Sequence, residues 1–406
     1  MRHERQIELL RRLKGLDPHE PWPLAPHTMR NPASAYADPG RFEDERRTLF
    51  RRRPQMLGLS SECATPGAYI TADLGGVPAL IVRQTDGSLR GFVNACRHRG
   101  APVAEGAGQR PRIACPYHGW VYDLDGTLAA RPYAEAAFDD EPKSSCGLLP
   151  VFVAEGYGLI FAQAEGGETL TAESALAGAQ EDIAEYGLES YVLIEARENT
   201  WQVNWKLILD TFTESYHIRT LHKNSIAATY STDVSLCESF GPHPQMIGLL
   251  KSVFAEFDKA SEADWRFLPH TTNQYIFMPS GLITYQRDHI ELWWVTPLAV
   301  DRTLVRTSLY APQAPATDKV RAYWTKNLDL LLQVTGTEDF PLMEKIQANL
   351  ASGALPELIY GKNEPALIHL HRSINEALAA ERISPPPLGE GDREAVEGAI
   401  GRGVAL

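Results

Sequence analysis

Two compact Cys–His pairs constrain this sequence more than any other feature. The first pairs Cys96 with His98, and the second pairs Cys115 with His118, so the spacings are Cys-x-His and Cys-x₂-His. A Rieske-type [2Fe–2S] cluster needs these donors, because two thiolates bind one iron and two imidazoles bind the other. A structural zinc site also uses two Cys and two His, but its usual pattern is Cys-x₂-Cys followed by His-x₃₋₅-His. The sequence therefore predicts a Rieske cluster carried on two short loops.

The other three cysteines, Cys63, Cys146 and Cys237, have no such partners and are expected to be small buried side chains. An odd total of five cysteines fits a disulfide framework poorly, which predicts a reduced, cytoplasmic protein. The first residues form no apolar signal segment, and no apolar run reaches the ~18 residues of a membrane span, so we expect neither secretion nor a membrane partner. A net charge of −13 argues against nucleic-acid binding, which needs clustered Lys and Arg.

The chain of 406 residues is long enough for two domains. From about residue 67 to residue 161, short alternating segments separated by turns such as Asp86-Gly87 predict a small antiparallel β-domain, inserted in a larger α+β domain. Residues 1–40 are expected to be irregular, and Pro385–Pro387 to begin a loose tail. We expect helices at 41–52, 172–186, 203–219, 319–333, 341–351 and 364–380, and strands at 69–74, 79–83, 89–93, 191–195, 274–278, 281–286, 290–295 and 303–310.

A second group of metal-binding side chains lies between residues 204 and 222. Asp210, Glu214 and His217 are spaced i, i+4 and i+7, so an α-helix would place all three on one face. Such groups are costly to bury in an apolar helix unless something binds them. His222 follows His217 by five residues, which turns it about 140° away on a regular helix. The helix must therefore end, or widen into a π-bulge, if both imidazoles are to reach one ion.

Two histidines need one carboxylate to complete the facial triad of a non-haem Fe(II) oxygenase, which leaves positions open for O₂ and substrate. Glu214 is one candidate for this carboxylate and Asp339 is another, and spacing alone does not choose between them. The alternative interpretation of this segment is a surface network of Asp, Glu and His.

Both motifs, in this order and at this separation, resemble the catalytic α subunit of the Rieske non-haem iron ring-hydroxylating oxygenases. The similarity extends from Tyr36–Pro39 to Asn363–Pro365 and so covers nearly the whole chain. It implies that His217, His222 and Asp339 hold a mononuclear Fe(II) ion, beside the Rieske [2Fe–2S] cluster.

The resemblance also implies a fold and a domain division. The five-residue step from Asp339 to Glu344 resembles the family pattern and favours Asp339 over Glu338 as the iron ligand. The expected fold class is α+β, with a Rieske domain at residues 51–165 inserted in a catalytic domain at 166–406. This catalytic domain is expected to have an antiparallel sheet flanked by helices, in a helix-grip-like arrangement, with residues 1–50 packing on it.

Glu214 receives a different role from the resemblance. In the family, an acidic residue three positions before the first iron histidine links that histidine to a Rieske histidine of a neighbouring subunit, by inference His118. The link is needed because the two metal centres of one subunit lie too far apart for fast electron transfer. This implies a homotrimer, with or without small β subunits. Glu214 stands where many aromatic dihydroxylating members have Asp, and Asp210 stands where many have Asn; we count both as catalytic candidates.

The expected activity is that of a terminal oxygenase component, which uses O₂ and electrons from NAD(P)H to hydroxylate a small substrate, aromatic on family frequency. One alternative is a monooxygenase or demethylase acting on a quaternary ammonium or N- or O-methylated compound, for which Glu214 is a feature. Another is a Rieske electron-transfer protein. A separate NAD(P)H-dependent reductase or ferredoxin is expected, because the sequence has no nucleotide-binding glycine fingerprint.

Two sets of residues are candidates for partner and substrate contacts. The first set is expected to dock an acidic electron donor and consists of Arg97, Arg99, Arg110 and Arg112; the alternative is that these are solvated loop charges. The second set is expected to line the substrate pocket and consists of Phe212, Ile218, Tyr275, Phe277, Ile283 and Trp293; the alternative is ordinary core packing.

Overall fold

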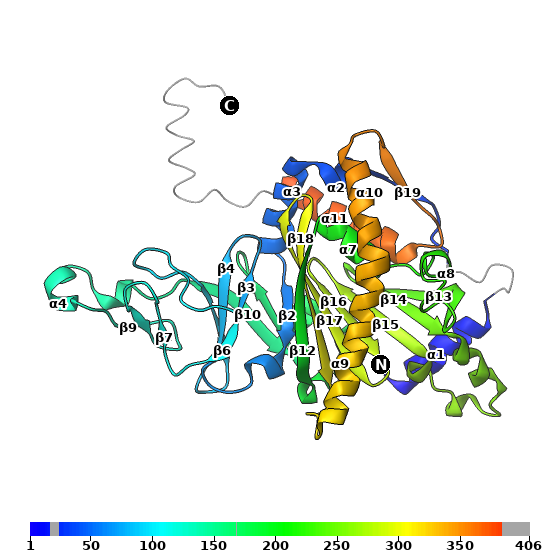
Figure 1. The fold of residues 1–406 in the computed structure, drawn as a ribbon, viewed down its shortest axis with the longest axis horizontal. Coiled ribbons are helices and arrows are strands. Elements are labelled where there is room, and N and C mark those ends of the chain that lie inside the picture. The colour runs from blue at the N-terminus through cyan, green and yellow to red at the C-terminus, as the bar shows by residue number, and fades with distance from the viewer. Residues whose placement is uncertain (17–23, 168, 384–406) are drawn as a thin grey trace.

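Two seven-stranded antiparallel sheets lie side by side along the long axis of the protein, in a computed structural model that describes residues 1–16, 24–167 and 169–383 (Figure 1). The first sheet has the order β2-β11-β10-β5-β4-β3-β6. Its strands are β2 (Gln55–Leu59), β3 (Ala68–Asp73), β4 (Pro78–Arg83), β5 (Leu89–Val93), β6 (Ala107–Gln109), β10 (Pro150–Gly156) and β11 (Leu159–Gln163). The predicted strands at 69–74, 79–83 and 89–93 coincide with β3, β4 and β5, so the small antiparallel β-domain is confirmed.

A third sheet of three short strands extends the first domain away from the rest of the molecule (Figure 1). It consists of β7 (Ile113–Ala114), β8 (Val121–Tyr122) and β9 (Leu128–Ala130). It packs with one face of the first sheet in a hydrophobic cluster that contains Leu80 and Val82 as well as Cys96, Cys115 and Trp120. The two Cys–His loops are therefore held by a hydrophobic cluster separate from the main cores.

The second large sheet has the order β12-β18-β17-β16-β15-β14-β13. Its strands are β12 (Val192–Trp201), β13 (Tyr230–Phe240), β14 (His243–Leu250), β15 (Thr271–Phe277), β16 (Gly281–Gln286), β17 (His289–Ala299) and β18 (Arg302–Ala311). Five of these were predicted, and β13 and β14 were not. Every residue of β14 is buried, so this strand lacks the polar–apolar alternation that marks a half-buried strand in a sequence.

Helices cover the second sheet, which confirms the α+β class (Figure 1). The predicted helices at 319–333, 341–351 and 364–380 correspond to α9 (Asp318–Val334), α10 (Phe340–Ala351) and α11 (Pro365–Ile383). One turn of π-helix, η8 (Thr335–Asp339), joins α9 to α10. No helix in the described ranges is long and apolar enough to cross a bilayer.

The N-terminal segment is more ordered than predicted. Residues 3–14 form α1, whose Leu9, Leu10 and Leu13 enter the main core. Further along, β1 (Met29–Pro32) pairs with β19 (Glu357–Tyr360). A strand whose partner lies at the other end of the chain leaves no local signal in the sequence, so the expectation of an irregular segment was wrong. The predicted tail after Pro385 lies outside the described residues.

Two predicted helices are broken. The one expected at 172–186 is two short helices, α5 (Ala172–Leu176) and α6 (Gln180–Ala184), separated where Ala177 adopts a left-handed conformation with φ 49°. The one expected at 203–219 is α7 (Trp205–Asp210) and α8 (Ile218–Leu221), with turns between them.

The remaining short helices are α2 (Ser34–Ala37), α3 (Pro39–Glu45), η1 (Arg46–Arg51), η2 (Ser60–Cys63), α4 (Ala134–Ala137), η3 (Lys143–Ser145), η4 (Leu188–Ser190), η5 (Lys251–Asp258), η6 (Glu262–Asp264) and η7 (Leu268–His270).

Helix α7 is anchored by a buried ion pair. Lys206 is fully buried, and its ammonium donates to the Glu45 carboxylate at 2.5 Å. The Trp205 indole donates to the same carboxylate at 2.9 Å. Asn204 caps the helix by accepting from the Lys206 backbone N–H at 3.1 Å. The Asn-Trp-Lys run thereby fixes the position of the segment that follows it, which carries the candidate iron ligands.

Candidate functional site

The two Cys–His loops share one backbone design. In each loop the cysteine carbonyl accepts a hydrogen bond from a glycine four residues later: Gly100 donates to Cys96 at 2.8 Å, and Gly119 donates to Cys115 at 3.1 Å. Both glycines are left-handed, with φ of 73° and 71°. A side chain would strain this conformation, which is why glycine stands in both loops. The loops therefore present their two Cys–His pairs in equivalent ways.

The four donors of these loops converge. The Nδ1 atoms of His98 and His118 lie 3.1 Å apart, and Trp120 stacks on the His98 ring with centroids 5.0 Å apart. All five cysteines lie within the described ranges and are unbridged, and Cys96 and Cys115 are buried. Burial raises the pKa of the Cys96 thiol, so a thiolate there needs a positive partner such as iron. Two thiols and two facing imidazoles fit the donor set of a Rieske cluster.

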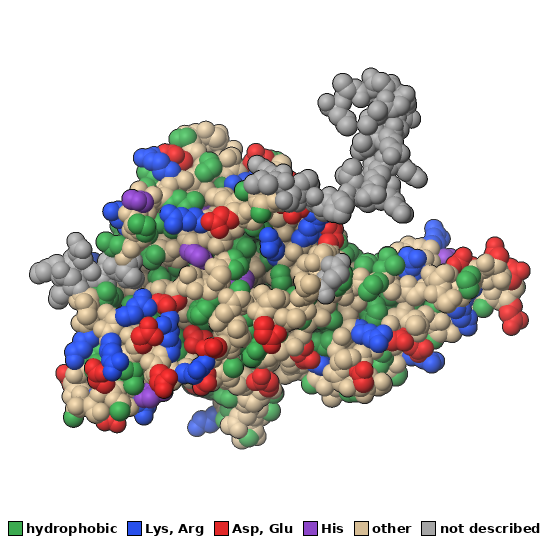
Figure 2. Space-filling model, turned by 180° about the vertical axis from the view of Figure 1, so that it is seen from behind, with side chains coloured by type: hydrophobic (Ala, Val, Ile, Leu, Met, Phe, Trp, Pro, Cys, Tyr) green, Lys and Arg blue, Asp and Glu red, His purple; other side chains and the backbone are tan. Residues whose placement is uncertain are grey.

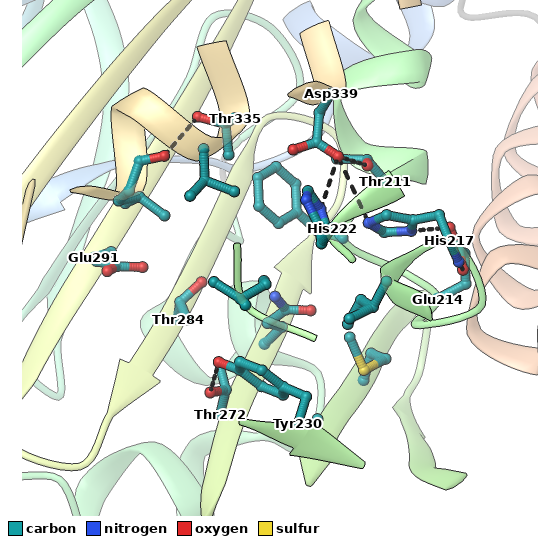
Figure 3. A pocket seen from close by; sticks show the side chains of 18 of the residues that line it. Thr211, Glu214, His217, His222, Tyr230, Thr272, Thr284, Glu291, Thr335 and Asp339 are labelled. Atoms are coloured by element: carbon teal, nitrogen blue, oxygen red, sulfur yellow. Dashed lines mark hydrogen bonds and ion pairs between the residues drawn. The ribbon is translucent and has the colours of Figure 1, made fainter. Parts of the chain in front are cut away.

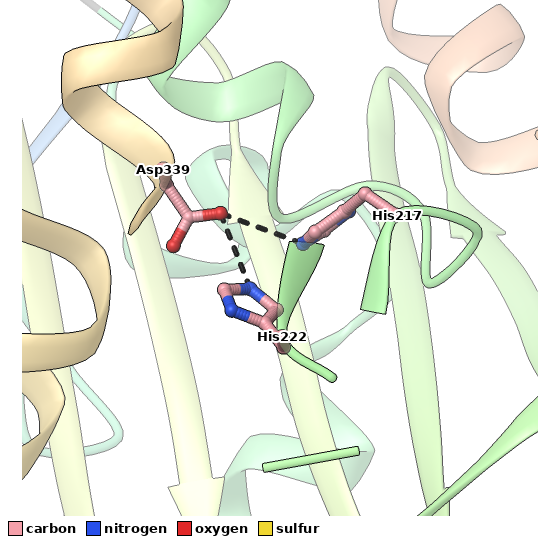
Figure 4. A group of neighbouring side chains, drawn as sticks. All are labelled: His217, His222 and Asp339. Carbon is pink, nitrogen blue, oxygen red and sulfur yellow. Dashed lines mark ion pairs between the residues drawn. The ribbon is translucent and has the colours of Figure 1, made fainter. Parts of the chain in front are cut away.

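A second set of donors meets beside the second sheet. The Asp339 Oδ1 atom lies 3.2 Å from His222 Nε2 and 3.6 Å from His217 Nε2 (Figure 4). One ligand atom of each residue lies within 4.8 Å of the other two. Asp339 and His222 are each only 3% exposed. Two imidazoles and a buried carboxylate this close together fit a single divalent ion, and they leave one side of it for other ligands.

Each of these histidines is held from behind by a glutamate. His217 Nδ1 is hydrogen-bonded to the Glu214 carboxylate. His222 Nδ1 is bonded to Glu338 at 2.6 Å, and Ser225 donates to the same carboxylate oxygen at 2.9 Å. Because carboxylates accept, each Nδ1 donates to its glutamate, and each Nε2, beside Asp339, is the nitrogen available to an ion. From the sequence, Glu338 is considered only as a rival ligand, and this orienting contact is missed.

The segment that leads from α7 to His217 explains how both histidines reach one point. Helix α7 ends at Asp210, and the Glu214 side chain then accepts from the backbone N–H groups of Tyr216 and His217. Such side-chain-to-backbone bonds compete with helix formation, so the predicted continuous helix is broken here. The helix ends as the spacing required. The π-helical turn lies in η8, which ends at Asp339, and not between His217 and His222.

Asp210 faces a different neighbourhood. Its carboxylate accepts from the Tyr36 hydroxyl at 2.5 Å and contacts His371 Nε2 at 2.9 Å. Tyr360 in turn contacts the Tyr36 hydroxyl. Burial, followed by the charge of Asp210, raises the pKa of Tyr36 well above its usual value, so its hydroxyl stays a donor. Asp210 is therefore tied to both ends of the chain, and it is not among the described residues that line the cavity beside Asp339.

A cavity of about 100 Å³ opens in front of the two histidines and Asp339 (Figure 3). Of the six predicted pocket residues, Phe212 and Ile218 line it. Tyr275, Phe277 and Ile283 are buried in the main core, and Trp293 packs on Phe212 outside the lining. The sheet residues that do line it include Gln274 and Thr284, the sequence neighbours of Tyr275 and Ile283. Alternate residues of a strand point to opposite faces of the sheet. The prediction named the residues of β15 and β16 that point away from the cavity.

The four arginines proposed for docking differ in their surroundings. Arg112 pairs with Asp123 at 2.7 Å, whereas Arg99 lies over the exposed Tyr117 ring at 5.5 Å. Figure 2 shows acidic and basic side chains mixed over one face of the molecule. A donor-docking role for these arginines stays a prediction.

Comparison with known proteins gives two family matches. Residues 53–152 match the Rieske [2Fe-2S] domain, and residues 188–380 match the ring hydroxylating alpha subunit (catalytic domain). Together they include the candidate donors of both sites.

Among curated proteins, the chain is 33% identical to choline monooxygenase, chloroplastic, of Spinacia oleracea over 214 residues, which is 51% of this chain and 47% of that protein. The match thus spans about half the length of that relative. The chain is also 28% identical to the carnitine monooxygenase oxygenase subunit of Escherichia coli (strain K12) over 345 residues, 83% of this chain and 86% of that one.

Solved structures share the fold. The quaternary ammonium Rieske monooxygenase CntA in complex with an inhibitor superposes with a TM-score of 0.73 at 23% identity, covering 86% of this chain and 96% of that one. Naphthalene 1,2-dioxygenase from Rhodococcus sp. bound to indole superposes with a TM-score of 0.71 at 19% identity, covering 94% and 99%.

Proposed function

Because the chain belongs to the Rieske non-haem iron ring-hydroxylating oxygenases, we propose that it is a terminal oxygenase component that oxidises a small quaternary ammonium or N-methylated compound. The observation that carries the proposal is the group of His217, His222 and Asp339 at the mouth of a cavity. The substrate class differs from the aromatic one expected on family frequency. It is supported by curated relatives that include choline, carnitine and glycine betaine monooxygenases, and by Glu214.

The proposed roles follow from the contacts. His217, His222 and Asp339 hold the mononuclear iron, and Cys96, His98, Cys115 and His118 hold the Rieske cluster. When bound, the iron supplies the activation of O₂ and the cluster supplies the electrons for it. Glu214 and Glu338 keep the two imidazoles turned towards Asp339 by accepting their Nδ1–H groups. Phe212 and Ile218 give the cavity an apolar wall that limits the access of water to the reacting carbon.

We further infer a homotrimer, with or without β subunits, in which Glu214 joins His217 to His118 of the partner subunit. Tyr117 beside His118 is 58% exposed, which supports a loop tip open to another subunit. The structure of a quaternary ammonium Rieske monooxygenase has given insights into inter-subunit electron transfer in that protein. Family members receive electrons through separate electron-transfer proteins; the donor we propose here is an NAD(P)H-dependent reductase or ferredoxin. Unbridged cysteines support a cytoplasmic location.

The domain division proposed from the sequence accompanies these roles. Every strand of the first seven-stranded sheet falls within residues 51–165, and every strand of the second falls within 166–406. Residues 1–50 contact the second domain through Glu45, which pairs with Lys206, and through β1, which pairs with β19. These contacts support a Rieske domain inserted in a catalytic domain that both ends of the chain complete.

Metal analysis and turnover test the function together. The purified protein should contain about three irons per chain, two in the cluster and one mononuclear. His217→Ala should lose the mononuclear iron and all product formation while it keeps the visible spectrum of the cluster. With a generic reductase, trimethylammonium compounds should stimulate O₂ uptake and yield product in proportion. Two irons per chain, with His217→Ala fully active in electron transfer, would instead identify an electron carrier.

A further inference from the structure

The floor of the cavity is one row of side chains across four neighbouring strands. Met246 of β14 lies opposite Gln274 of β15, Gln274 lies opposite Thr284 of β16, and Thr284 lies opposite Glu291 of β17. Directly paired residues of antiparallel strands share a face of the sheet, and all four side chains line the cavity. Figure 3 shows Thr284 and Glu291 on the side of the cavity away from His217. The row therefore ends in a carboxylate at the far end of the cavity.

Three members of this row have unused capacity to accept hydrogen bonds. Thr284 is 2% exposed, and its hydroxyl has no hydrogen-bond partner; nor does Gln274 Oε1. Glu291 is 3% exposed and has two long contacts, 3.5 Å from Gln286 Nε2 and 3.3 Å from His289 Nε2. Hydrogen bonds to a carboxylate are normally ~2.7–2.9 Å long. Buried acceptors are costly when left unpaired, so this end of the cavity favours a bound molecule that brings hydrogen-bond donors.

The charge at this end is negative. His289 lies between two carboxylates, 2.8 Å from Asp288 and 3.3 Å from Glu291. Burial opposes its protonation, but hydrogen bonds to Glu291 and Asp288 raise the pKa of His289. One imidazolium cannot neutralise two carboxylates, and none of the described residues lining the cavity is Lys or Arg. A negatively charged group entering here would meet Glu291, whose charged neighbour His289 is shared with Asp288.

We propose that Glu291, with Thr284 and Gln274, binds the end of the substrate that lies away from the iron, and that this end is an ammonium or hydroxyl donor rather than a carboxylate. The inference rests on the proposed function, since it assumes that the N-methyl end faces His217 and Asp339. It divides the trimethylammonium compounds by their other end. Compounds that end in –OH or –NH₃⁺ donate hydrogen bonds to these three side chains, whereas compounds that end in –COO⁻ are repelled by the Glu291 carboxylate.

Binding to the anaerobic, iron-loaded protein, measured by calorimetry, tests this division. The probes are choline, (2-aminoethyl)trimethylammonium and glycine betaine, which share a head group and differ in their other end. The wild-type protein should bind the amine-ended and hydroxyl-ended probes at least tenfold more tightly than glycine betaine. Glu291→Gln should reduce this preference to less than threefold. Asp288→Asn is the matched control, because it removes an equal charge that contacts His289 outside the cavity lining; it should leave the preference within twofold.

Thr284→Val provides a second variant, which keeps the test decisive if Glu291→Gln does not fold. Because the Thr284 hydroxyl has no partner, its removal should leave the thermal stability unchanged. It should nevertheless weaken the amine-ended probe three- to tenfold and barely affect glycine betaine. A purely structural role for this row would give the opposite pattern, with lost stability and equal effects on all probes.

The outcomes separate this inference from the proposed function. Equal binding of the three probes to the wild-type protein, or an unchanged preference in folded Glu291→Gln, overturns the role of Glu291 while the oxidation of trimethylammonium compounds still stands. If none of the probes binds and none supports O₂ uptake although three irons are present, the proposed substrate class is wrong and the role of Glu291 falls with it.

Discussion

The two metal-binding regions of this protein are built in opposite ways. All four proposed donors of the first lie within residues 96–118, on two loops with the same glycine-closed backbone. The second joins His222 to Glu338, which are 116 residues apart, and uses a helix end and a π-helical turn. The first region depends on local conformation, whereas the second depends on how two distant segments are packed. Substitutions should therefore affect the two regions independently and by different mechanisms.

The largest effect is expected from Cys96→Ala. Loss of one thiolate should abolish the cluster, reduce the iron content from about three to about one per chain, and eliminate turnover. The visible spectrum and metal analysis measure this directly. Cys63→Ala is the matched control in the same domain, because Cys63 is also buried but donates to the Ala68 carbonyl at 3.3 Å; it should keep the cluster. Loss of the mononuclear iron as well would show that the two regions are not independent.

Glu338→Gln should have the next largest effect, confined to the second region. Without the carboxylate, His222 loses the acceptor that orients it, and the affinity for the mononuclear iron should fall about 10- to 100-fold. Titration of the apo-site with Fe(II) measures the affinity, and the cluster spectrum should not change. Glu344→Gln removes an equal charge from the neighbouring helix, where Glu344 accepts from the Gln202 backbone, and should leave iron binding intact. Equal losses in both variants would contradict an orienting role.

Gly100→Ala and Gly119→Ala should have moderate and nearly equal effects. Each places a side chain in a left-handed conformation, which costs about 1–2 kcal/mol, and in each loop a Cβ atom would have room. The temperature at which the cluster spectrum bleaches should fall by a similar amount in both variants. Gly336→Ala, in the π-helical turn beside the iron site, should leave this temperature unchanged. Strongly unequal effects in the two loops would show that their equivalence is only superficial.

The smallest effect is a pH dependence that belongs to the second domain. Hydrogen bonds to Glu291 and Asp288 outweigh burial and raise the pKa of His289 above the usual histidine value of about 6.5. A raised pKa contributes stability that is fully present below about pH 6.5 and is lost as the pH rises through the folded-state value. The unfolding temperature of the second domain should be about 2 °C higher at about pH 6 than at about pH 8.5. His289→Gln should abolish this difference and leave bleaching of the cluster unaffected.

The same contrast explains what the sequence could predict. The four cluster donors could be proposed from the sequence because their spacing is local. His217 and His222 could be proposed because His217 shares a helical spacing with Asp210 and Glu214 and because the family resemblance assigns both histidines to iron. Glu338 was missed because its contact with His222 depends on packing between distant segments. The cavity floor was assigned to Tyr275 and Ile283, whereas the structure places their neighbours Gln274 and Thr284 there. A strand's periodicity gives two faces but not which one is covered, and only the pairing with the helices decides it.

The pairing of β1 with β19 has a consequence for how the protein is made. Met29 must wait for Tyr360, near the other end of the chain, before it has a partner. The first seven-stranded sheet, in contrast, is complete once residue 163 has left the ribosome. Contacts between distant parts of a chain form late, because closing a long loop costs entropy before any contact rewards it. We therefore expect the first seven-stranded sheet to form during synthesis before the second domain, whose β1–β19 pair needs residues from both sides of that sheet. The second domain, which carries His217, His222 and Asp339, is completed only when β19 reaches β1.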